Sequence, residues 1–491
     1  MHFQIPYYSY RERYDTKLLA LYHALKDTIT GGVLAYDSRI PSTRELAQLY
    51  GLSRGTANQV YEMLTSEGYV RSETGRGTFV SYRLSPGAAG TGPGMEAART
   101  PSFRLSPWGE RVQQISSREE DAALQPDPPA VIDFSRFAPD PGAFPREAWT
   151  RCLYAQVREL SSPAGPLRAH PAQGCLALRE AIARYLRRAR GMAVQPEHVA
   201  VTGGSMQALA LLAQLLIGEG EAAVVETPAY TGTRRAIVAA GGRCTDAIVD
   251  AQGIVPADWD AKAAFVTPTR QFPTGAVLSL ERRQALLRWA YEREAVIVED
   301  DYDSEFRHRG KSLEPLKALD REERVVYVGS FTKTLLPGLR LGYAVLPPAL
   351  AEPFARALAH YEPQPVHLLE QMGLAAFMAS GEYERHLRRM KRIYSRKFHS
   401  LTQLLQSELS GLFDWVESDA GLHVFGWWRG TAESYAAYRR RCFAAGVKWA
   451  EVPVAASDGQ WRQGLYLNFP HIPEEALREG VFRMKQAESG C

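Results

Sequence analysis

One stretch of sequence divides this chain into two parts that must fold separately. Residues 83–131 contain the run Ser85-Pro86-Gly87-Ala88-Ala89-Gly90-Thr91-Gly92-Pro93-Gly94 and, further on, Gln125-Pro126-Asp127-Pro128-Pro129, with little apolar periodicity. Polar sequence rich in proline and glycine is typical of flexible, partly extended linkers. The sequence therefore predicts an N-terminal domain over residues 1–82, a flexible linker over 83–131 and a larger C-terminal domain over 132–491.

Composition excludes several classes of protein. No stretch approaches the roughly 18 uninterrupted apolar residues of a membrane span, and the N-terminus lacks the layout of a signal peptide, so we expect a cytoplasmic protein without a membrane partner. The five cysteines are scattered, with no CxxC pair and no histidine at metal spacing, which argues against disulfides and against a metal site. The net charge is +3, and residues 1–82 carry nine Lys and Arg against eight Asp and Glu. Charge alone therefore does not indicate a nucleic-acid partner.

The N-terminal domain contains two adjacent helices joined by a glycine turn. Ser42 and Glu45 form a capping box, which predicts a helix beginning at Thr43, and Gly51 ends that helix. Ser53 caps a second helix with apolar residues at helical spacing. The segment 71–80 that follows reads as two short strands around a turn. This pattern predicts a helix-turn-helix with a β wing, although an ordinary pair of packed helices would give a similar helical pattern.

The C-terminal domain alternates apolar strands with helices, which predicts an α/β fold with a mostly parallel sheet. The clearest strands are Ala222 to Val225, Ala263 to Thr267, Ala295 to Glu299 and Arg324 to Val328. The clearest helices are Gly174 to Arg188, Met206 to Leu216 and Leu280 to Glu292.

Chemically distinctive residues follow two of these strands. Lys333 comes shortly after the strand that ends at Val328, and Asp300 and Tyr302 stand at the end of another strand. A lone lysine in a loop is usually a solvated surface residue, but α/β sheets bind ligands beyond the carboxyl ends of their strands. A cofactor with an aldehyde, a ring nitrogen, a phenolic oxygen and a phosphate needs an amine, a carboxylate, a hydroxyl and an anion cradle. All four groups are available here.

The N-terminal sequence "IPSTRELAQLYGLSRGTANQVYEMLTSEGYV", followed by "GRGTFVS", resembles the winged helix-turn-helix of the GntR superfamily of bacterial regulators. The resemblance implies that Arg44, Ser53, Arg54 and Thr56 contact the major groove of DNA or its phosphates, and that Arg76 and Gly77 enter the minor groove from the wing. The alternative is that Arg44 and Arg54 are merely solvated.

The C-terminal domain resembles the fold-type I aminotransferases from about Leu167 to Val345. The resemblance implies that Lys333 forms the internal aldimine with pyridoxal 5'-phosphate, that Asp300 pairs with the pyridine nitrogen and that Tyr302 donates to the phenolate oxygen. Thr202-Gly203-Gly204-Ser205-Met206-Gln207 opens a helix whose first amides favour an anion. By the same resemblance Ser205, Met206, Ser330 and Arg340 hold the phosphate and Tyr230 stacks on the ring, although hydroxyls in turns commonly satisfy only the backbone.

The combination of this head, the linker and the motifs "QFPTG", "EDDYDSEFR" and "SFTKTLLPGLRLGY" resembles the MocR/GabR family of transcriptional regulators along essentially the whole chain. Two departures stand out. Arg270 occupies a position where histidine is commoner in such sequences, and Gly464 aligns with the arginine that binds the substrate carboxylate in aminotransferases. Arg462 lies two residues away and is a candidate replacement for that arginine.

Three functions remain open on this basis. The first is a regulator of a double-stranded DNA operator that senses an amine or amino-acid effector through aldimine exchange at Lys333. The second is a regulator that responds to the cofactor itself. The third is an active aminotransferase with an accessory DNA-binding domain, because transamination needs the same lysine, aspartate and tyrosine. The DNA-reading head favours a regulator, and both domains favour a homodimer.

Overall fold

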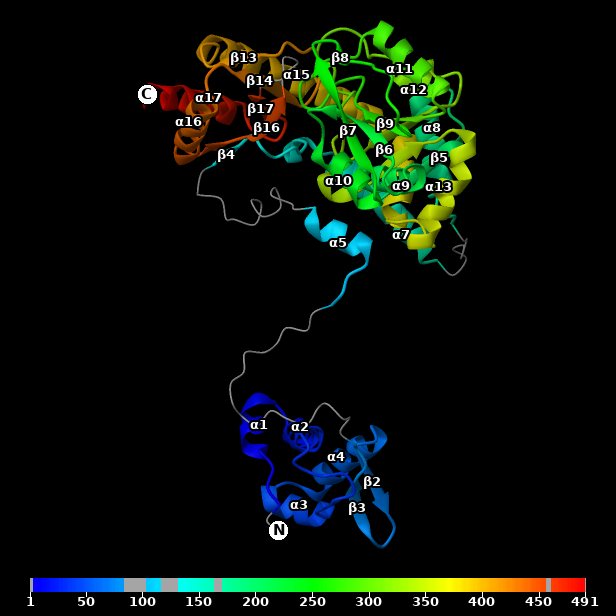
Figure 1. Ribbon diagram of the computed structural model, residues 1–491, viewed down its shortest axis with the longest axis vertical. Helices are drawn as coiled ribbons and strands as arrows, with labels where there is room; N and C mark the ends of the chain where they lie inside the picture. Colours follow the sequence, from blue (N-terminus) through cyan, green and yellow to red (C-terminus); the bar gives the residue numbers. More distant parts are fainter. Residues whose placement is uncertain (1–2, 84–102, 116–130, 163–169, 456–460, 491) are drawn as a thin grey trace. The chain divides into compact units, whose positions relative to one another are not determined.

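The computed structural model describes residues 3–83, 103–115, 131–162, 170–455 and 461–490 (Figure 1). The chain forms two compact units, Met1–Phe103 and Arg104–Cys491. In the described part of the chain, no helix is both long enough and apolar enough to cross a membrane.

The first unit is a winged helix-turn-helix, as the sequence predicts. Its helices are α1 Tyr7–Arg13, α2 Lys17–Thr30, α3 Thr43–Tyr50 and α4 Arg54–Ser66, and its strands are β1 Arg39–Ile40, β2 Val70–Glu73 and β3 Gly77–Val80. The strands form an antiparallel sheet in the order β1-β3-β2. The predicted capping box is present, because the Ser42 amide donates to Oε2 of Glu45 at 2.8 Å and the Glu45 amide donates to Oγ of Ser42 at 3.3 Å. Gly51 ends α3 in the left-handed conformation.

The second unit is built on an eight-stranded sheet in the order β5-β12-β11-β10-β9-β6-β7-β8. The strands are β5 Val199–Thr202, β6 Ala222–Thr227, β7 Arg243–Asp250, β8 Gly253–Ile254, β9 Ala263–Val266, β10 Val296–Asp301, β11 Val325–Ser330 and β12 Gly342–Val345. Only β12 and β8 run antiparallel to their neighbours. The predicted α/β fold with a mostly parallel sheet is therefore confirmed.

Helices cover both faces of this sheet, which explains why its strands are apolar throughout. The helices are α7 Arg146–Leu160, α8 Leu176–Arg190, α9 Ser205–Leu216, α10 Thr231–Ala240, α11 Leu280–Glu292, α12 Leu316–Leu319, α13 Pro348–Tyr361 and α14 Leu368–Ala379. Along β11, Val326 and Val328 enter the core formed with α9, α10 and α13, whereas Tyr327 enters the core formed with α8 and α14. Successive side chains of one strand therefore serve opposite faces.

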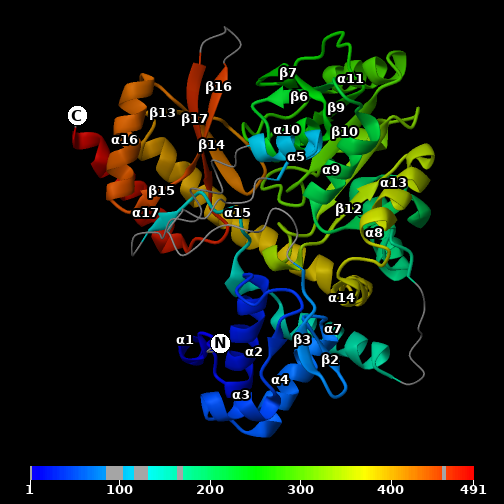
Figure 2. The same cartoon turned by 60° about the horizontal axis from the view of Figure 1, so that its bottom comes forward.

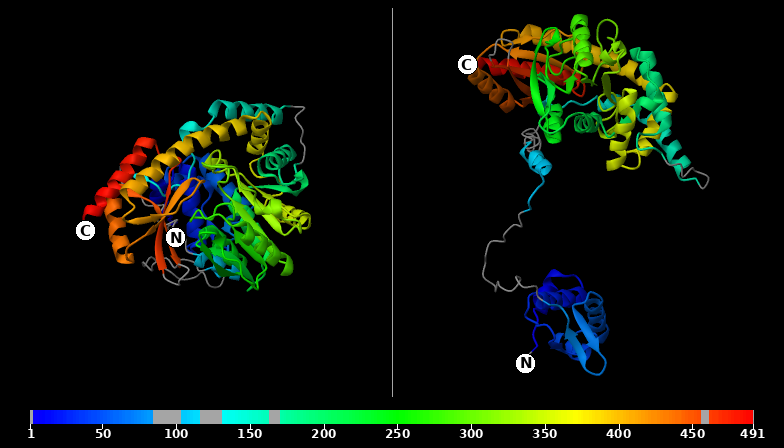
Figure 3. Two further views of the ribbon diagram at one scale, coloured as in Figure 1. Left: turned by 90° about the horizontal axis from the view of Figure 1, so that it is seen from above. Right: turned by 45° about the vertical axis from the view of Figure 1, so that its right-hand side comes forward.

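A smaller four-stranded sheet completes the second unit, in the order β13-β14-β17-β16. Its strands are β13 Phe413–Trp415, β14 His423–Trp428, β16 Ala450–Ala455 and β17 Trp461–Asn468, and its helices are α15 Glu382–Glu408, α16 Ala432–Ala444 and α17 Glu474–Gln486. A short parallel pair joins β4 Ile132–Asp133 to β15 Val447–Lys448. The long helix α15 contacts both α14 and α17, so it runs from the large sheet's layers to the small sheet (Figures 2 and 3).

A helix also forms inside the stretch for which the sequence predicts a flexible linker. Helix α5, Pro107–Gln114, begins with a Ser106 cap and a proline in its first turn, and it contacts α10 (Figure 2). Arg111 of α5 donates to Glu219 at 3.1 Å, which anchors the helix to the second unit. The linker prediction missed α5 because eight residues between two proline-rich runs give little periodic signal.

Candidate cofactor and DNA sites

The parallel strands of the large sheet bring the predicted cofactor residues to one edge. Strands β5, β6, β9, β10 and β11 run in the same direction, so the segments that follow them all leave the sheet at its carboxyl edge. Asp300 pairs with Val328 in the register of β10 and β11, and Ser330, Gly342 and Thr202 lie level with one another across β11, β12 and β5. Ligands of open α/β sheets bind at this edge.

Lys333 is a largely buried amine. Its Nζ donates to the main-chain carbonyl oxygen of Phe137 at 2.8 Å and lies 3.7 Å from the centre of the Phe137 ring. Burial lowers the pKa of Lys333 to about 8, although the carboxylates of Asp303 and Asp300 act in the opposite direction. The amine is therefore available without its proton far more readily than an ordinary lysine.

Asp300 carries a carboxylate oxygen with no partner. Its Oδ1 is buried and forms no hydrogen bond with any described residue. Burial raises the pKa of this carboxyl to about 7, and the nearby acids Asp301 and Glu226 raise it further. A protonated ring nitrogen would satisfy this oxygen, so the residue fits the pyridine end of pyridoxal phosphate.

Tyr302 follows Asp300 and is held by a buried arginine. The Tyr302 hydroxyl accepts a hydrogen bond from Nη1 of Arg270 at 2.9 Å. The rings of Phe137 and Phe272 both approach the Tyr302 ring edge to face, with centroids 6.0 and 5.6 Å away. These contacts fix the position of the phenol.

An anion cradle lies where β5 leads into α9. Helix α9 begins at Ser205, so the amides of Ser205 and Met206 are in its first turn, where a helix attracts negative charge. A Cβ at Gly342 would come within 2.8 Å of the Ser205 amide nitrogen, so only glycine allows β12 to pass this closely. The Arg340 guanidinium lies beside Gly204, and the Ser330 hydroxyl accepts from the Thr332 amide at 3.2 Å.

Tyr230 lies at the start of α10, on the same side as the cradle. A Cβ at Gly232 would overlap both the Tyr230 ring and the sulfur of Met206, so these two side chains meet over that glycine. The Phe272 ring approaches Tyr230 edge to face at 6.2 Å. Tyr230 is 37% exposed.

Gly464 lies in β17, where it pairs with Trp427 and Val452. A Cβ at this position would come within 2.5 Å of Cζ of Phe425, whose ring is buried. An arginine therefore cannot replace Gly464 unless Phe425 moves. Two residues on, Tyr466 contacts Phe272 and His423, so this position of the strand faces the Tyr302 region. Arg462 is the second residue of β17, but its side chain lies outside the described part.

The predicted DNA-contacting residues of the first unit cluster around α3 and α4. Arg44 and Arg54 are exposed, and neither forms an ion pair with a described residue. Ser53 caps α4 by accepting from the Thr56 amide at 3.0 Å, and the two hydroxyls lie 2.8 Å apart. The two arginines therefore present uncompensated positive charge beside the first turn of α4.

The wing presents a different arrangement. Arg76 is exposed but donates to Glu73 at 2.8 Å, which partly neutralises it. Arg39 is also exposed, and its Nε lies 2.8 Å from where a Cβ of Gly77 would be. Arg39 forms no ion pair with a described residue. The sequence reasoning missed Arg39, although its place two residues before Pro41 and the capping box gave a hint.

Several residues of the cofactor region carry no signal in the sequence. Phe137 and His423 are separated from Lys333 by long stretches of chain, and no motif marks them. Arg270 stands out only as an unusual residue beside the "QFPTG" motif. Asp303, which pairs with Arg270 at 3.2 Å, sits in the "EDDYDSEFR" motif and could have been found there.

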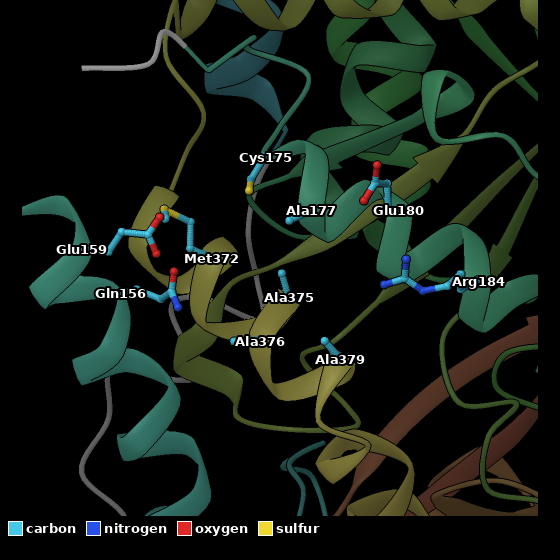
Figure 4. Close-up of a pocket in the computed structure, with 10 residues that line it drawn as sticks. All are labelled: Gln156, Glu159, Cys175, Ala177, Glu180, Arg184, Met372, Ala375, Ala376 and Ala379. Carbon is cyan, nitrogen blue, oxygen red and sulfur yellow. The ribbon is translucent and has the colours of Figure 1, made fainter. Parts of the chain in front are cut away.

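A pocket of about 300 Å³ lies between α7, α8 and α14 (Figure 4). Gln156 and Glu159 of α7, Glu180 and Arg184 of α8 and Met372 of α14 line it. None of the predicted cofactor residues lines this pocket, so it is separate from the cofactor region.

Comparison with protein families gives two matches on this chain. Residues 18–80 match the gntR family of bacterial regulatory proteins, and residues 167–448 match aminotransferase class I and II. The probable rhizopine catabolism regulatory protein MocR of Rhizobium meliloti is 34% identical over 95% of this chain and 92% of its own length. The HTH-type pyridoxine biosynthesis transcriptional regulator PdxR of Corynebacterium glutamicum is 32% identical over 76% of this chain and 75% of its own length.

The second unit is also similar to solved enzymes. The crystal structure of LysN, the alpha-aminoadipate aminotransferase of Thermus thermophilus, complexed with N-(5'-phosphopyridoxyl)-L-leucine, is 27% identical. The match has a TM-score of 0.66 and covers 78% of this chain and 97% of that one. The fold of the second unit is therefore that of an aminotransferase that holds a phosphopyridoxyl group.

Proposed function

The chain belongs to the MocR-type regulators of the GntR family, and from that premise we propose that it regulates transcription in response to an amine or amino acid that reacts at Lys333. The matches support a transcriptional regulator, in which the first unit binds DNA and the second unit binds pyridoxal phosphate. One observation supports sensing at this site. The buried Oδ1 of Asp300 has no hydrogen-bond partner among the described residues, and it shares the site with Lys333, an amine whose pKa is lowered by burial.

Each cofactor residue has a task that its surroundings support. The bound cofactor supplies an aldehyde for covalent capture of amines and a ring that withdraws electrons. Lys333 would hold the cofactor through its aldehyde carbon, and its Nζ would be the site that holds or gives up a proton. Asp300 keeps the ring nitrogen protonated, and Tyr302 hydrogen-bonds the phenolic oxygen. Ser205, Met206, Ser330 and Arg340 bind the phosphate, and Tyr230 stacks on the ring.

The DNA-binding surface comprises Arg44, Ser53, Arg54 and Thr56 at the start of α3 and α4, and Arg76 and Gly77 in the wing. We add Arg39 to this surface because its guanidinium lies against Gly77 and forms no salt bridge with a described residue, although its charge acts on the Glu45 carboxylate. The uncompensated arginines supply the phosphate contacts that orient the head on the duplex, and α4 supplies the base contacts.

The effector amine would act by replacing the Lys333 amine on the cofactor. An amine that displaced Lys333 would leave the Lys333 amine free beside Asp300 and Asp303. If the resulting ligand binds two arrangements of the protein unequally, occupancy of the operator changes. A homodimer suits both parts, since paired heads read repeated half-sites and aminotransferase-like sites form at subunit interfaces.

The alternative is an active aminotransferase, and the intact set of Lys333, Asp300 and Tyr302 favours it. The crowded surroundings of Gly464 speak against it, because an α-amino acid gains no carboxylate clamp at that position. Without a clamp, each lost charge-assisted contact weakens binding by about 1.5–3 kcal/mol. Turnover suffers more, because proton removal requires an aligned substrate.

The test combines trapping, turnover and DNA binding on the full-length protein. Borohydride reduction and peptide mass analysis should place the cofactor on Lys333, and Lys333→Ala should abolish that adduct. Amines that change the visible spectrum should also change binding to the DNA upstream of the gene, with negligible multiple turnover. A turnover rate of about 10 s⁻¹, together with a DNA affinity that the amine does not change, would favour the aminotransferase.

A further inference from the structure

Arg270 is a buried cation beside the residues that hold the cofactor ring. Its side chain is 4% exposed, and the glycine at position 421 leaves the space that the guanidinium fills. Nη1 donates to the Tyr302 hydroxyl at 2.9 Å and to Oδ2 of Asp303 at 3.2 Å. Nη2 donates to the main-chain oxygen of His423 at 2.8 Å. Nε of Arg270 is buried without a hydrogen-bond partner among the described residues, so the two terminal nitrogens make the contacts that hold the guanidinium.

The chemistry of the two groups sets the direction of the bond between Arg270 and Tyr302. A guanidinium has donors and no acceptor, so the Tyr302 hydroxyl must accept. The hydroxyl has a single hydrogen, which this bond leaves unused. No described residue accepts that hydrogen. It is therefore available to a ligand at the carboxyl edge of the sheet.

The charges around Arg270 preserve this arrangement. Asp303 compensates the guanidinium, and burial holds the pKa of His423 well below its ordinary range, so that ring is neutral. Burial raises the pKa of Tyr302, with Arg270 acting in the opposite direction, so the phenol keeps its hydrogen. Among the described residues, Asp300 and Lys333 also lie in this region, where Asp301 and Glu226 act on the Asp300 carboxyl and Arg340 acts on the Lys333 amine.

We propose that Arg270 is a positioning residue that turns the Tyr302 hydroxyl so that it donates its hydrogen to the phenolic oxygen of pyridoxal phosphate. This inference rests on the cofactor role proposed for Tyr302. Arg270 itself binds no effector carboxylate, because its two terminal nitrogens are already engaged and it is buried. Its effect on the cofactor passes through Tyr302.

A hydroxyl held in this direction stabilises negative charge on the phenolic oxygen of the bound cofactor. The form of the chromophore that has lost its proton carries that charge, so Arg270 lowers the pH at which the visible band changes. Arg270→Gln replaces a pure donor by a group that can also accept, which lets the hydroxyl rotate. We expect the spectroscopic pKa to rise by about half to one unit in this variant.

The experiment is a pH titration of the visible spectrum of the holoprotein in four forms: wild type, Arg270→Gln, Tyr302→Phe and the double variant. Action through Tyr302 predicts that Arg270→Gln raises the pKa in the wild-type background and has little effect in the Tyr302→Phe background. An equal shift in both backgrounds, or no shift in either, overturns the proposal. Failure of the wild-type protein to form the Lys333 adduct would instead overturn the cofactor assignment.

Two further variants keep the test decisive. Arg179 is also a buried arginine, but it bonds Gly174, Gln173 and Pro196, so Arg179→Gln should leave the titration unchanged. If Arg270→Gln does not fold, Arg270→Lys provides the alternative, because a lysine keeps the donor polarity. The Lys variant should titrate like the wild type, and a rise equal to that of Tyr302→Phe would contradict the proposal.

Discussion

The amine of Lys333 lies 2.8 Å from the main-chain carbonyl oxygen of Phe137. The bond joins the loop after β11 to the segment between β4 and α7, two parts of the second unit that are far apart in sequence. This hydrogen bond fixes the direction of Nζ, and the amine must be without its extra proton before its lone pair can attack an aldehyde. The surroundings of this lysine therefore govern how the protein captures its cofactor.

Capture of pyridoxal phosphate by the apoprotein should depend on pH with a midpoint near the pKa of Lys333. Burial lowers that pKa from 10.5 to about 8, and only the unprotonated amine attacks an aldehyde. The rate should therefore rise through about pH 8 and then level off. Rapid-mixing absorbance between about pH 6.5 and 9.5 measures it, with Lys333→Arg as the control that captures nothing. A rate that still climbs steeply at the upper limit would indicate an ordinary lysine.

Asp300→Asn should stabilise the apoprotein while it weakens cofactor binding. The pKa of Asp300 is raised in the folded state, from 3.8 to about 7. The protonated carboxyl contributes stability that is fully present below about pH 4 and is lost as the pH rises through about 7, where a charge without a partner is buried. The variant should gain about 1–3 kcal/mol at pH 8 and less at pH 6.

Denaturant unfolding of both apoproteins at the two pH values measures this difference. Asp258 provides the control, because its carboxylate is exposed and paired with Arg293, so Asp258→Asn should not stabilise the protein. An Asp300→Asn apoprotein that is no more stable than the wild type at pH 8 would argue against a buried, unpaired carboxylate.

Arg54 and Arg44 should affect DNA binding in different ways. If Arg54 reads a base from the start of α4, Arg54→Ala should lower affinity for the specific operator by about 1–3 kcal/mol. If Arg44 contacts a phosphate, Arg44→Ala should weaken binding to all sequences and reduce the salt slope by about one. Binding to upstream and random duplexes at several salt concentrations separates the two. A wild-type protein without preference for upstream DNA would contradict specific recognition.

In the wing, Arg39→Ala should weaken DNA binding more than Arg76→Ala. Arg39 lies against Gly77 without a salt bridge to a described residue, whereas Glu73 forms a salt bridge with Arg76 and partly neutralises it. The Arg39 variant should reduce the salt slope by about one. Glu73→Gln frees Arg76 and should strengthen binding at low salt. If both arginine variants lost the same DNA affinity and Glu73→Gln gained none, the salt bridge between Arg76 and Glu73 would have no effect on DNA binding.

Local sequence patterns predict much of this protein correctly. The capping box at Ser42 and the glycine at 51 define α3 without help from the rest of the molecule, because their hydrogen bonds lie within one turn. The apolar runs that became β9, β10 and β11 are evident for the same reason. Helix α5 was missed, because its anchor is Glu219, more than a hundred residues away.

The predicted cofactor residues follow strands, and parallel strands send their carboxyl ends to one edge whatever the order of the strands. Strand-end position brought Lys333, Asp300 and Tyr302 together from the sequence, whereas Ser205 and Tyr230 were added by the resemblance to fold-type I aminotransferases. The roles of these side chains remain proposals, as do those of the DNA-contacting arginines. Their surroundings needed the structure, since an exposed arginine and one paired with Glu73 look alike in a sequence.

Capping, periodicity and strand-end position are local properties, so the sequence alone predicts a helix-turn-helix head and an α/β body whose strand ends carry an amine, a carboxylate and a phenol, and the resemblance to the GntR superfamily implies that the head reads DNA. Only the tertiary structure decided what surrounds those groups. Lys333 donates a hydrogen bond to Phe137, Arg270 donates one to Tyr302, and His423 of the smaller sheet accepts one from Arg270. These contacts join residues that are distant in sequence. They follow from how the two sheets pack, which no periodicity records.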